Sequence, residues 1–149
     1  MKHLSIAVIF FLSIVGVANA KPIGGNDSSF NGSQEFKHDF PQATYVTYKV
    51  KGQMTEVNFV WNSMHLQAFY DEQGQLMATC RPVEVSNLPV AAQLSLKNAY
   101  PTGIVRDAIE FNDPNDGVSY YTTVIDPKAT YVLHVSTGGT ISVFKKMKN

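Results

Sequence analysis

The chain has little cysteine and no excess of either charge, and both features restrict what the protein can be. Its 149 residues contain one cysteine, Cys80, so no internal disulfide can form and stability must come from packing. Twelve basic residues balance twelve acidic ones, and the basic stripe expected of a nucleic-acid-binding protein is missing. Cys80 is either a reactive thiol, able to bridge to another chain, or a small buried hydrophobe, and we favour the second.

The sequence also lacks the residue patterns of common catalytic and metal sites. His38, His65 and His134 lie far apart, without the helical spacing or the cysteine and carboxylate neighbours typical of a metal site. There is no Gly-x-Ser-x-Gly elbow and no phosphate loop. The acidic residues in the turns are too few and too irregularly spaced for a calcium loop. We therefore expect a protein that is not an enzyme, with no catalytic residues, no cofactor and no metal.

One hydrophobic run stands at the start of the chain. Residues 4–17 are apolar, follow the basic pair Lys2 and His3, and precede Ala-Asn-Ala at 18–20. This layout predicts a cleavable secretory signal over residues 1–20, because the run is shorter than the roughly 20 residues of a membrane-spanning helix. The alternative is an uncleaved anchor. Cleavage predicts a periplasmic or secreted protein with no membrane association.

The next residues, 21–33, are rich in Gly, Ser, Asn and Asp and predict a flexible tether. Residues 34–149 are expected to form one domain in which a helix followed by four strands occurs twice. "FKHDFP" at 36–41 is similar to "LKNAYP" at 96–101, and each proline ends a predicted helix. Strands rich in β-branched and aromatic residues are expected over 43–50, 55–61, 65–71, 75–80, 104–111, 119–125, 130–136 and 140–146.

The similarity extends to the last hairpin of each half. Residues 66–78 align with residues 131–143, which places Gly74 on Gly139. We predict an α+β fold made by tandem duplication of a helix-plus-antiparallel-sheet unit (34–80 and 86–146), with the helices packed on one face of the sheet. Chance similarity between two amphipathic stretches is the alternative.

The order of these motifs resembles a known family. A signal peptide, an aromatic-x-x-x-aromatic-Pro helix end, Trp61 at a strand end, "AFYDEQGQLMAT", a second helix from "LP" to "YP" and a final "Y-x-L-x-V-x-x-x-G" turn are similar to PepSY-like, β-lactamase-inhibitor-like domains of exported bacterial proteins. The resemblance covers roughly residues 34–146. It implies a small periplasmic or secreted α+β protein without catalytic residues, and an inhibitor of this fold grips its enzyme with the face of its sheet.

Alternation along the strands predicts which side chains share each face. The alignment assigns Leu66, Ala68, Tyr70, Leu76, Ala78, Tyr131, Leu133, Val135, Ile141 and Val143 to the helix-covered side. The other side then holds His65, Gln67, Phe69, Met77, Thr79, Val132, His134, Ser142 and Phe144, a set without Lys or Glu that suits protein binding. From it we select a candidate protein-binding face: Phe69, Met77, His134, Phe144 and His65. This face is either open or covered by loops, by the tether or by a second copy.

The expected function is that of an exported binding or inhibitory module whose sheet face engages an envelope or secreted protein, such as a peptidase or another enzyme. The alternative is a periplasmic small-ligand-binding or envelope-stress protein that holds an apolar molecule between helices and sheet. The sequence does not indicate an oligomeric state.

Overall fold

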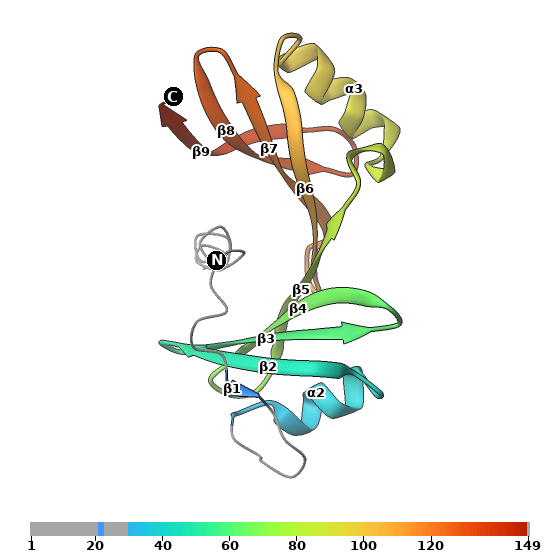
Figure 1. Ribbon diagram of the computed structural model, residues 1–149, viewed down its shortest axis with the longest axis vertical. Coiled ribbons are helices and arrows are strands. Elements are labelled where there is room, and N and C mark those ends of the chain that lie inside the picture. The colour runs from blue at the N-terminus through green and yellow to red at the C-terminus, as the bar shows by residue number, and fades with distance from the viewer. Residues whose placement is uncertain (1–20, 23–29, 149) are drawn as a thin grey trace.

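The computed structural model describes residues 21–22 and 30–148, which form one antiparallel sheet and two α-helices (Figure 1). The strands follow one another across the sheet in chain order, from β1 to β9. The predicted leader and most of the predicted tether lie outside the described residues. Among the described residues no helix is long and apolar enough to span a membrane. The elements are β1 (Lys21–Pro22), α2 (Ser33–Asp39), β2 (Thr44–Lys51), β3 (Met54–Trp61), β4 (Met64–Asp71), β5 (Leu76–Val83), a 3₁₀ turn (Val85–Asn87), α3 (Val90–Ala99), β6 (Ile104–Asp113), β7 (Gly117–Asp126), β8 (Ala129–Ser136) and β9 (Ile141–Lys148).

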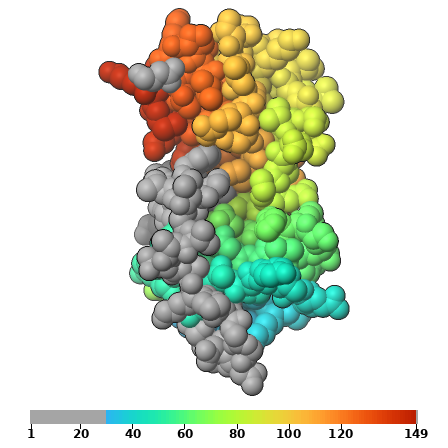
Figure 2. All heavy atoms as spheres, viewed as in Figure 1, coloured from blue at the N-terminus to red at the C-terminus, as the bar shows by residue number. Residues whose placement is uncertain are grey.

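Both helices pack on the same face of the sheet, at opposite ends of an elongated molecule (Figures 1 and 2). The α2 cluster comprises Phe30, Phe36, Phe40, Tyr48, Val57, Phe59, Ala68 and Tyr70. The α3 cluster comprises Leu88, Ala92, Leu96, Ala108, Tyr120, Val124, Leu133 and Val135. The predicted α+β class and the helix-covered side of β4 and β8 are therefore confirmed.

Each helix ends as its proline predicts. The backbone N–H of Phe40 donates to the carbonyl of Phe36 at 2.9 Å, and that of Tyr100 donates to the carbonyl of Leu96 at 2.9 Å. The following Pro41 and Pro101 prevent a further helical turn because the residue before a proline is driven out of the α region.

The alternation of Val57, Phe59 and Trp61 predicts that Trp61 is largely buried, and the side chain does pack against the α2 cluster with Val57 and Phe59. Its indole is only half-buried, and its Nε1–H donates to the carbonyl of Pro41 at 2.9 Å. This bond ties the end of β3 to the residue that follows α2.

The fold begins earlier than the predicted tether allows. Phe30 is buried among Tyr48 and Tyr70, with ring centroids 5.1 and 6.1 Å away, and Ser33 is the first residue of α2. The sequence suggested a tether up to residue 33 because small polar residues surround Phe30, but one large aromatic side chain is enough to anchor such a segment in a core.

A β-bulge in β4–β5 changes the predicted face of two residues, and a second bulge lies in β9. In β4–β5, Phe69 pairs with Ala78 and Tyr70 with Leu76, so Met77 is an extra residue. Because a bulge reverses the alternation beyond it, Ala78 lies on the side opposite the helices and Thr79 on the helix-covered side; both assignments from the sequence were wrong. In β9 the extra residue is Phe144, since Leu133 pairs with Val143 and Val132 with Lys145.

The same backbone contacts recur in the two halves. Asp71 N–H donates to the carbonyl of Gln75 at 3.0 Å, and Ser136 N–H donates to the carbonyl of Thr140 at 2.9 Å. The N–H of Gly74 closes the first turn on the carbonyl of Asp71 (3.1 Å), as that of Gly139 closes the second on Ser136 (3.0 Å). Phe36 and Leu96 are both buried at the same place in their helices.

Candidate functional site

The candidate site is the sheet face opposite α2 and α3, which we call the helix-free face. No helix in the part of the chain that the structure describes contributes to its buried cluster. The cluster contains Met54, Phe69, Ala78, Cys80, Ile109, Phe111, Tyr121 and Val132, with the half-buried Met77, Phe144 and Met147 packed against it. These residues come from every strand between β3 and β9, so the cluster joins the two halves of the sheet.

Aromatic contacts organise the centre of this face. The ring of Tyr121 makes edge-on contacts with Phe111 at 5.8 Å and with Phe144 at 5.4 Å between centroids. The imidazole of His134 lies 5.1 Å from the same ring on its cross-strand neighbour. Such pairs add to the stability gained by burial and fix the ring orientations.

The structure brings four of the five predicted site residues together. Phe69 belongs to the cluster and is 1% exposed, while Met77 and Phe144 pack against it from the two bulges. His134 reaches the cluster through Tyr121. His65 shares the face by register but is exposed near the start of β4, opposite Val60, and lies at the periphery.

A polar network on the first half of this face was missed by the sequence reasoning. Glu56 is 4% exposed; its carboxylate accepts from Lys51 Nζ at 2.5 Å and from Asn58 Nδ2 at 3.2 Å. Gln67 Nε2 donates to Asn58 Oδ1 at 2.6 Å, and the thiol of Cys80 donates to Gln67 Oε1 at 3.5 Å. A carboxylate this buried is stable only when paired and hydrogen-bonded, as it is here.

The expectation of a face without Lys or Glu was therefore wrong. It rested on an alignment that left out the second and third strands and the bulge that turns Lys145 to this side. The alternation of Glu56 and Asn58 with the apolar Val57 and Phe59 was the signal that could have revealed the network.

Burial favours the neutral forms of two titratable groups of this face, the Cys80 thiol and the His134 imidazole. Burial, and to a smaller extent the Glu56 carboxylate, raises the pKa of the Cys80 thiol well above its usual range. A thiol that stays protonated is a poor nucleophile, and the preferred interpretation of Cys80 as a buried residue is confirmed. Burial also lowers the pKa of His134 below its ordinary value of 6.5.

No metal site is visible in the ranges 21–22 and 30–148, where no group of three or more His, Cys, Asp or Glu side chains converges. The nearest histidine–carboxylate pair, His38 Nδ1 and Asp39 Oδ1 at 3.2 Å, lies on the exposed side of α2.

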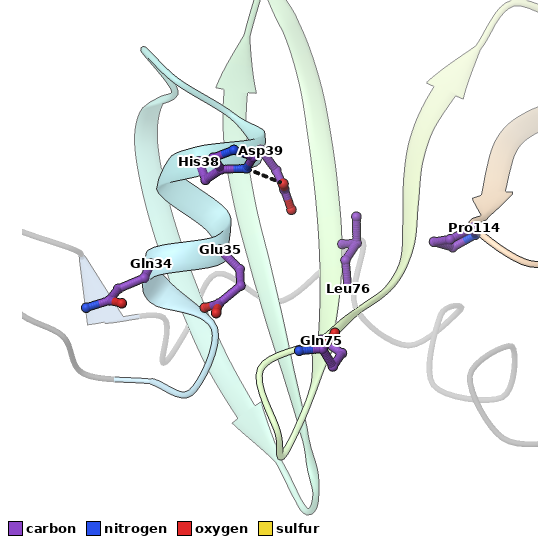
Figure 3. A pocket seen from close by; sticks show the side chains of 7 residues that line it. All are labelled: Gln34, Glu35, His38, Asp39, Gln75, Leu76 and Pro114. Atoms are coloured by element: carbon purple, nitrogen blue, oxygen red, sulfur yellow. Dashed lines mark hydrogen bonds and ion pairs between the residues drawn. The ribbon is translucent and has the colours of Figure 1, made fainter.

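A second feature is an open depression of about 540 Å³ between α2 and the β4–β5 turn (Figure 3). It is lined by Gln34, Glu35, His38, Asp39, Gln75, Leu76 and Pro114. Its side chains are mostly polar, whereas the space between α2 and the sheet is filled by the aromatic α2 cluster. An apolar molecule held between helix and sheet, as the alternative function requires, finds no cavity at this place.

The comparisons with known proteins agree on the fold. A BLIP-like protein from Bacteroides fragilis NCTC 9343 superimposes with a TM-score of 0.69 at 21% identity, over 78% of this chain and 84% of its own. A DUF2874 family protein from Bacteroides ovatus ATCC 8483 superimposes with a TM-score of 0.70 at 18% sequence identity, over 87% of this chain and 89% of its own. A candidate periplasmic protein from Bacteroides eggerthii DSM 20697 superimposes with a TM-score of 0.68 at 13% sequence identity, over 79% of this chain and 86% of its own.

No family model matches the sequence, and no curated protein is significantly similar to it. The likeness to a β-lactamase-inhibitor-like fold is thus supported by solved structures, whereas the PepSY-like label is not. The B. eggerthii protein agrees with the periplasmic location that the leader predicts. The chain has an α+β fold shared with a BLIP-like protein and a DUF2874 family protein of Bacteroides.

Proposed function

We propose that the protein is an exported, non-enzymatic binding or inhibitory module that engages another protein through its helix-free face. The observation that carries the proposal is the single cluster that runs from β3 to β9 on this face. The α2 and α3 clusters, by contrast, are each confined to one half of the sheet. The cluster itself is buried, so a partner would find its apolar contacts in the half-buried Met77, Phe144 and Met147, which pack against it from β5 and β9.

The composition of the face is that of a protein interface. Aromatic and methionine side chains provide large contact areas and dominate binding energy in many complexes. Ile104 at the start of β6 and Ile125 near the end of β7 form a cross-strand pair on this face, and their side chains are 68% and 37% exposed. Ile125 pairs with Thr130 of β8, which in turn pairs with Met147 of β9 at the edge of the cluster.

The partner class we propose is an envelope or secreted protein, such as a peptidase or another enzyme. The BLIP-like neighbour supports this class only through its fold, which is a weak warrant for function. Inhibition requires that the face cover the partner's active site, which binding alone does not.

We also propose that the sheet arose by tandem duplication of the unit at 34–80, copied as 86–146. The support is the repeated order of one helix and four strands, with a bulge in the last hairpin of each half and matching turn hydrogen bonds at Gly74 and Gly139. The aromatic cluster of the helix-free face then lies where the two units meet.

The test is capture of a partner from periplasmic extract with the protein starting at Lys21, followed by affinity measurements with point variants. Ile104→Ala and Phe144→Ala should each weaken the complex by about 1–3 kcal/mol. The control is Leu94→Ala, an exposed apolar residue on the outer side of α3, which should leave the affinity unchanged. Equal affinity of the wild type and both face variants would exclude this face as the binding site.

Export is tested separately by mass spectrometry of the protein recovered from the periplasm or medium. The expected N-terminus is Lys21, because small residues occupy positions 18 and 20 before it. A membrane-bound protein that retains residues 1–20 would contradict the cleavage.

A further inference from the structure

The strand β9 is an edge of the sheet and has an unusual charge. It follows β8 at the end of the strand order, so within the described residues no strand lies on its outer side. Three lysines, Lys145, Lys146 and Lys148, occur in its eight residues, and no acidic residue does. An edge strand offers a row of backbone N–H and C=O groups to any extended chain that can pair with it.

The length and composition of β9 favour such pairing. It has eight residues, as many as β8, and it includes Val143, which is 55% exposed. The opposite edge of the sheet differs, because β1 already pairs with β2 at Tyr48 and Thr47. Lysines and a bulge on an edge strand are also a common protection against unwanted pairing. The charge of a segment should therefore determine whether it can pair with β9.

The lysines project to both sides of the sheet. Lys145 pairs with Val132 and shares the helix-free face, whereas Lys146 pairs with Tyr131 and lies over its ring, 5.5 Å from the centroid. Lys148 alternates with Met147 and shares the side of Lys146. A strand added to β9 would therefore meet Lys146 and Lys148 on one face, and on the other face Lys145 beside the apolar Phe144 and Met147. Opposite charges across a strand pair are favourable and like charges are unfavourable, so acidic residues suit the first face and apolar residues the second.

We propose that β9 is a strand-addition site for an extended segment of a partner protein that alternates acidic and apolar residues. A second copy of this chain does not fit, because antiparallel pairing of β9 with itself would gather the lysines of both copies along one seam. The site is the backbone edge of β9, which borders the helix-free face at Phe144, Lys145 and Met147, and the proposal does not depend on the proposed function.

The probe is a capped eight-residue peptide of alternating Val and Glu, titrated against the full protein at low salt while backbone amide signals are followed by NMR. Binding should shift and protect the amides of β9 and weaken as salt rises. A second peptide with the same charge but with two internal prolines cannot form a strand and should not bind. Equal binding of both peptides would reduce the interaction to non-specific charge attraction and overturn the proposal.

Charge reversal supplies the matched variants. The triple variant K145E/K146E/K148E should lose affinity for the Glu peptide by about tenfold or more and gain affinity for the equivalent Lys peptide. The control K37E/K97E/K128E changes the net charge equally at exposed lysines outside β9 and should keep the original preference. Circular dichroism verifies that both variants fold. Three outcomes would each refute the site. The first is an equal loss of affinity for the Glu peptide in both triple variants, and the second is no peptide binding by the wild type. The third is sedimentation of the wild type as a dimer that K145E/K146E/K148E abolishes.

Discussion

Replacement of Gly139 by alanine is the sharpest test of how the second half of the sheet is assembled. Gly139 closes the β8–β9 turn with a φ of +87°, and the turn is pressed against α3. A Cβ at this position would lie 2.6 Å from the carbonyl oxygen of Ala91 and 2.7 Å from Ser95 Oγ. The first contact is with helix backbone, which cannot move without shifting α3 on its cluster.

Two costs add at this position. An L-residue in the left-handed region costs about 1–2 kcal/mol, and overpacking against a rigid neighbour costs about 1–3 kcal/mol. We therefore expect Gly139→Ala to lower the free energy of unfolding by about 2–5 kcal/mol, a large part of the stability of a small domain. Gly74→Ala should behave alike, because its Cβ would lie 2.6 Å from the backbone nitrogen of Gly32.

The chain offers matched controls for the backbone term. Gly52 (φ +61°) and Gly117 (φ +78°) are also left-handed turn residues, but an added Cβ there meets nothing within 4 Å. Their alanine variants should show only the conformational cost of about 1–2 kcal/mol. Urea unfolding of the four variants separates the two terms. If Gly139→Ala and Gly74→Ala cost no more than the controls, the turns do not press on the helices as described.

Two further predictions concern the helix-free face. Phe69→Ala should lower the free energy of unfolding by about 3–5 kcal/mol, as truncation of a buried phenylalanine does, because Phe69 is 1% exposed. Phe144→Ala should cost less, because Phe144 is only half-buried. A larger loss of stability at Phe144 than at Phe69 in urea titrations would contradict the burial pattern. Because burial lowers the pKa of His134, the unfolded chain binds more protons just below pH 6.5, so stability should fall as pH drops through this value. His134→Gln should flatten this dependence between pH 7 and pH 5, and identical slopes for the two proteins would refute the assignment.

Alternation and turn chemistry predicted most of the elements correctly. The prolines at 41 and 101 mark both helix ends, and the strands of the second half lie within a few residues of their expected bounds. Alternation placed Ala68, Tyr70 and Leu133 on the helix-covered side because β4 and β8 are regular over this stretch. It failed for Ala78 and Thr79, since one extra residue reverses every face beyond it and no sequence pattern announced the bulge at Met77.

The sequence predicted only part of the candidate site, because alternation was applied only to the hairpins that the alignment of the two halves covered. Phe69, Met77, His134 and Phe144 were found because the alignment covered their hairpins, and the structure joins them in or beside one cluster. The network of Lys51, Glu56 and Gln67 was missed because its members are distant in sequence and ordinary as single residues. Only the register of β2 with β3 and of β3 with β4 shows that they meet.

The bulges also explain why the two faces of the sheet differ. In a regular strand successive side chains point to opposite faces. In β5 both Met77 and Ala78 instead join the cluster of the helix-free face, and in β9 Phe144 joins it beside Lys145, the partner of Val132. Each half of the sheet thus directs one more large side chain to this face than alternation allows. Bulges often occur where a side chain must be re-aimed at a functional surface, and here both add apolar contact area to the face that carries no helix.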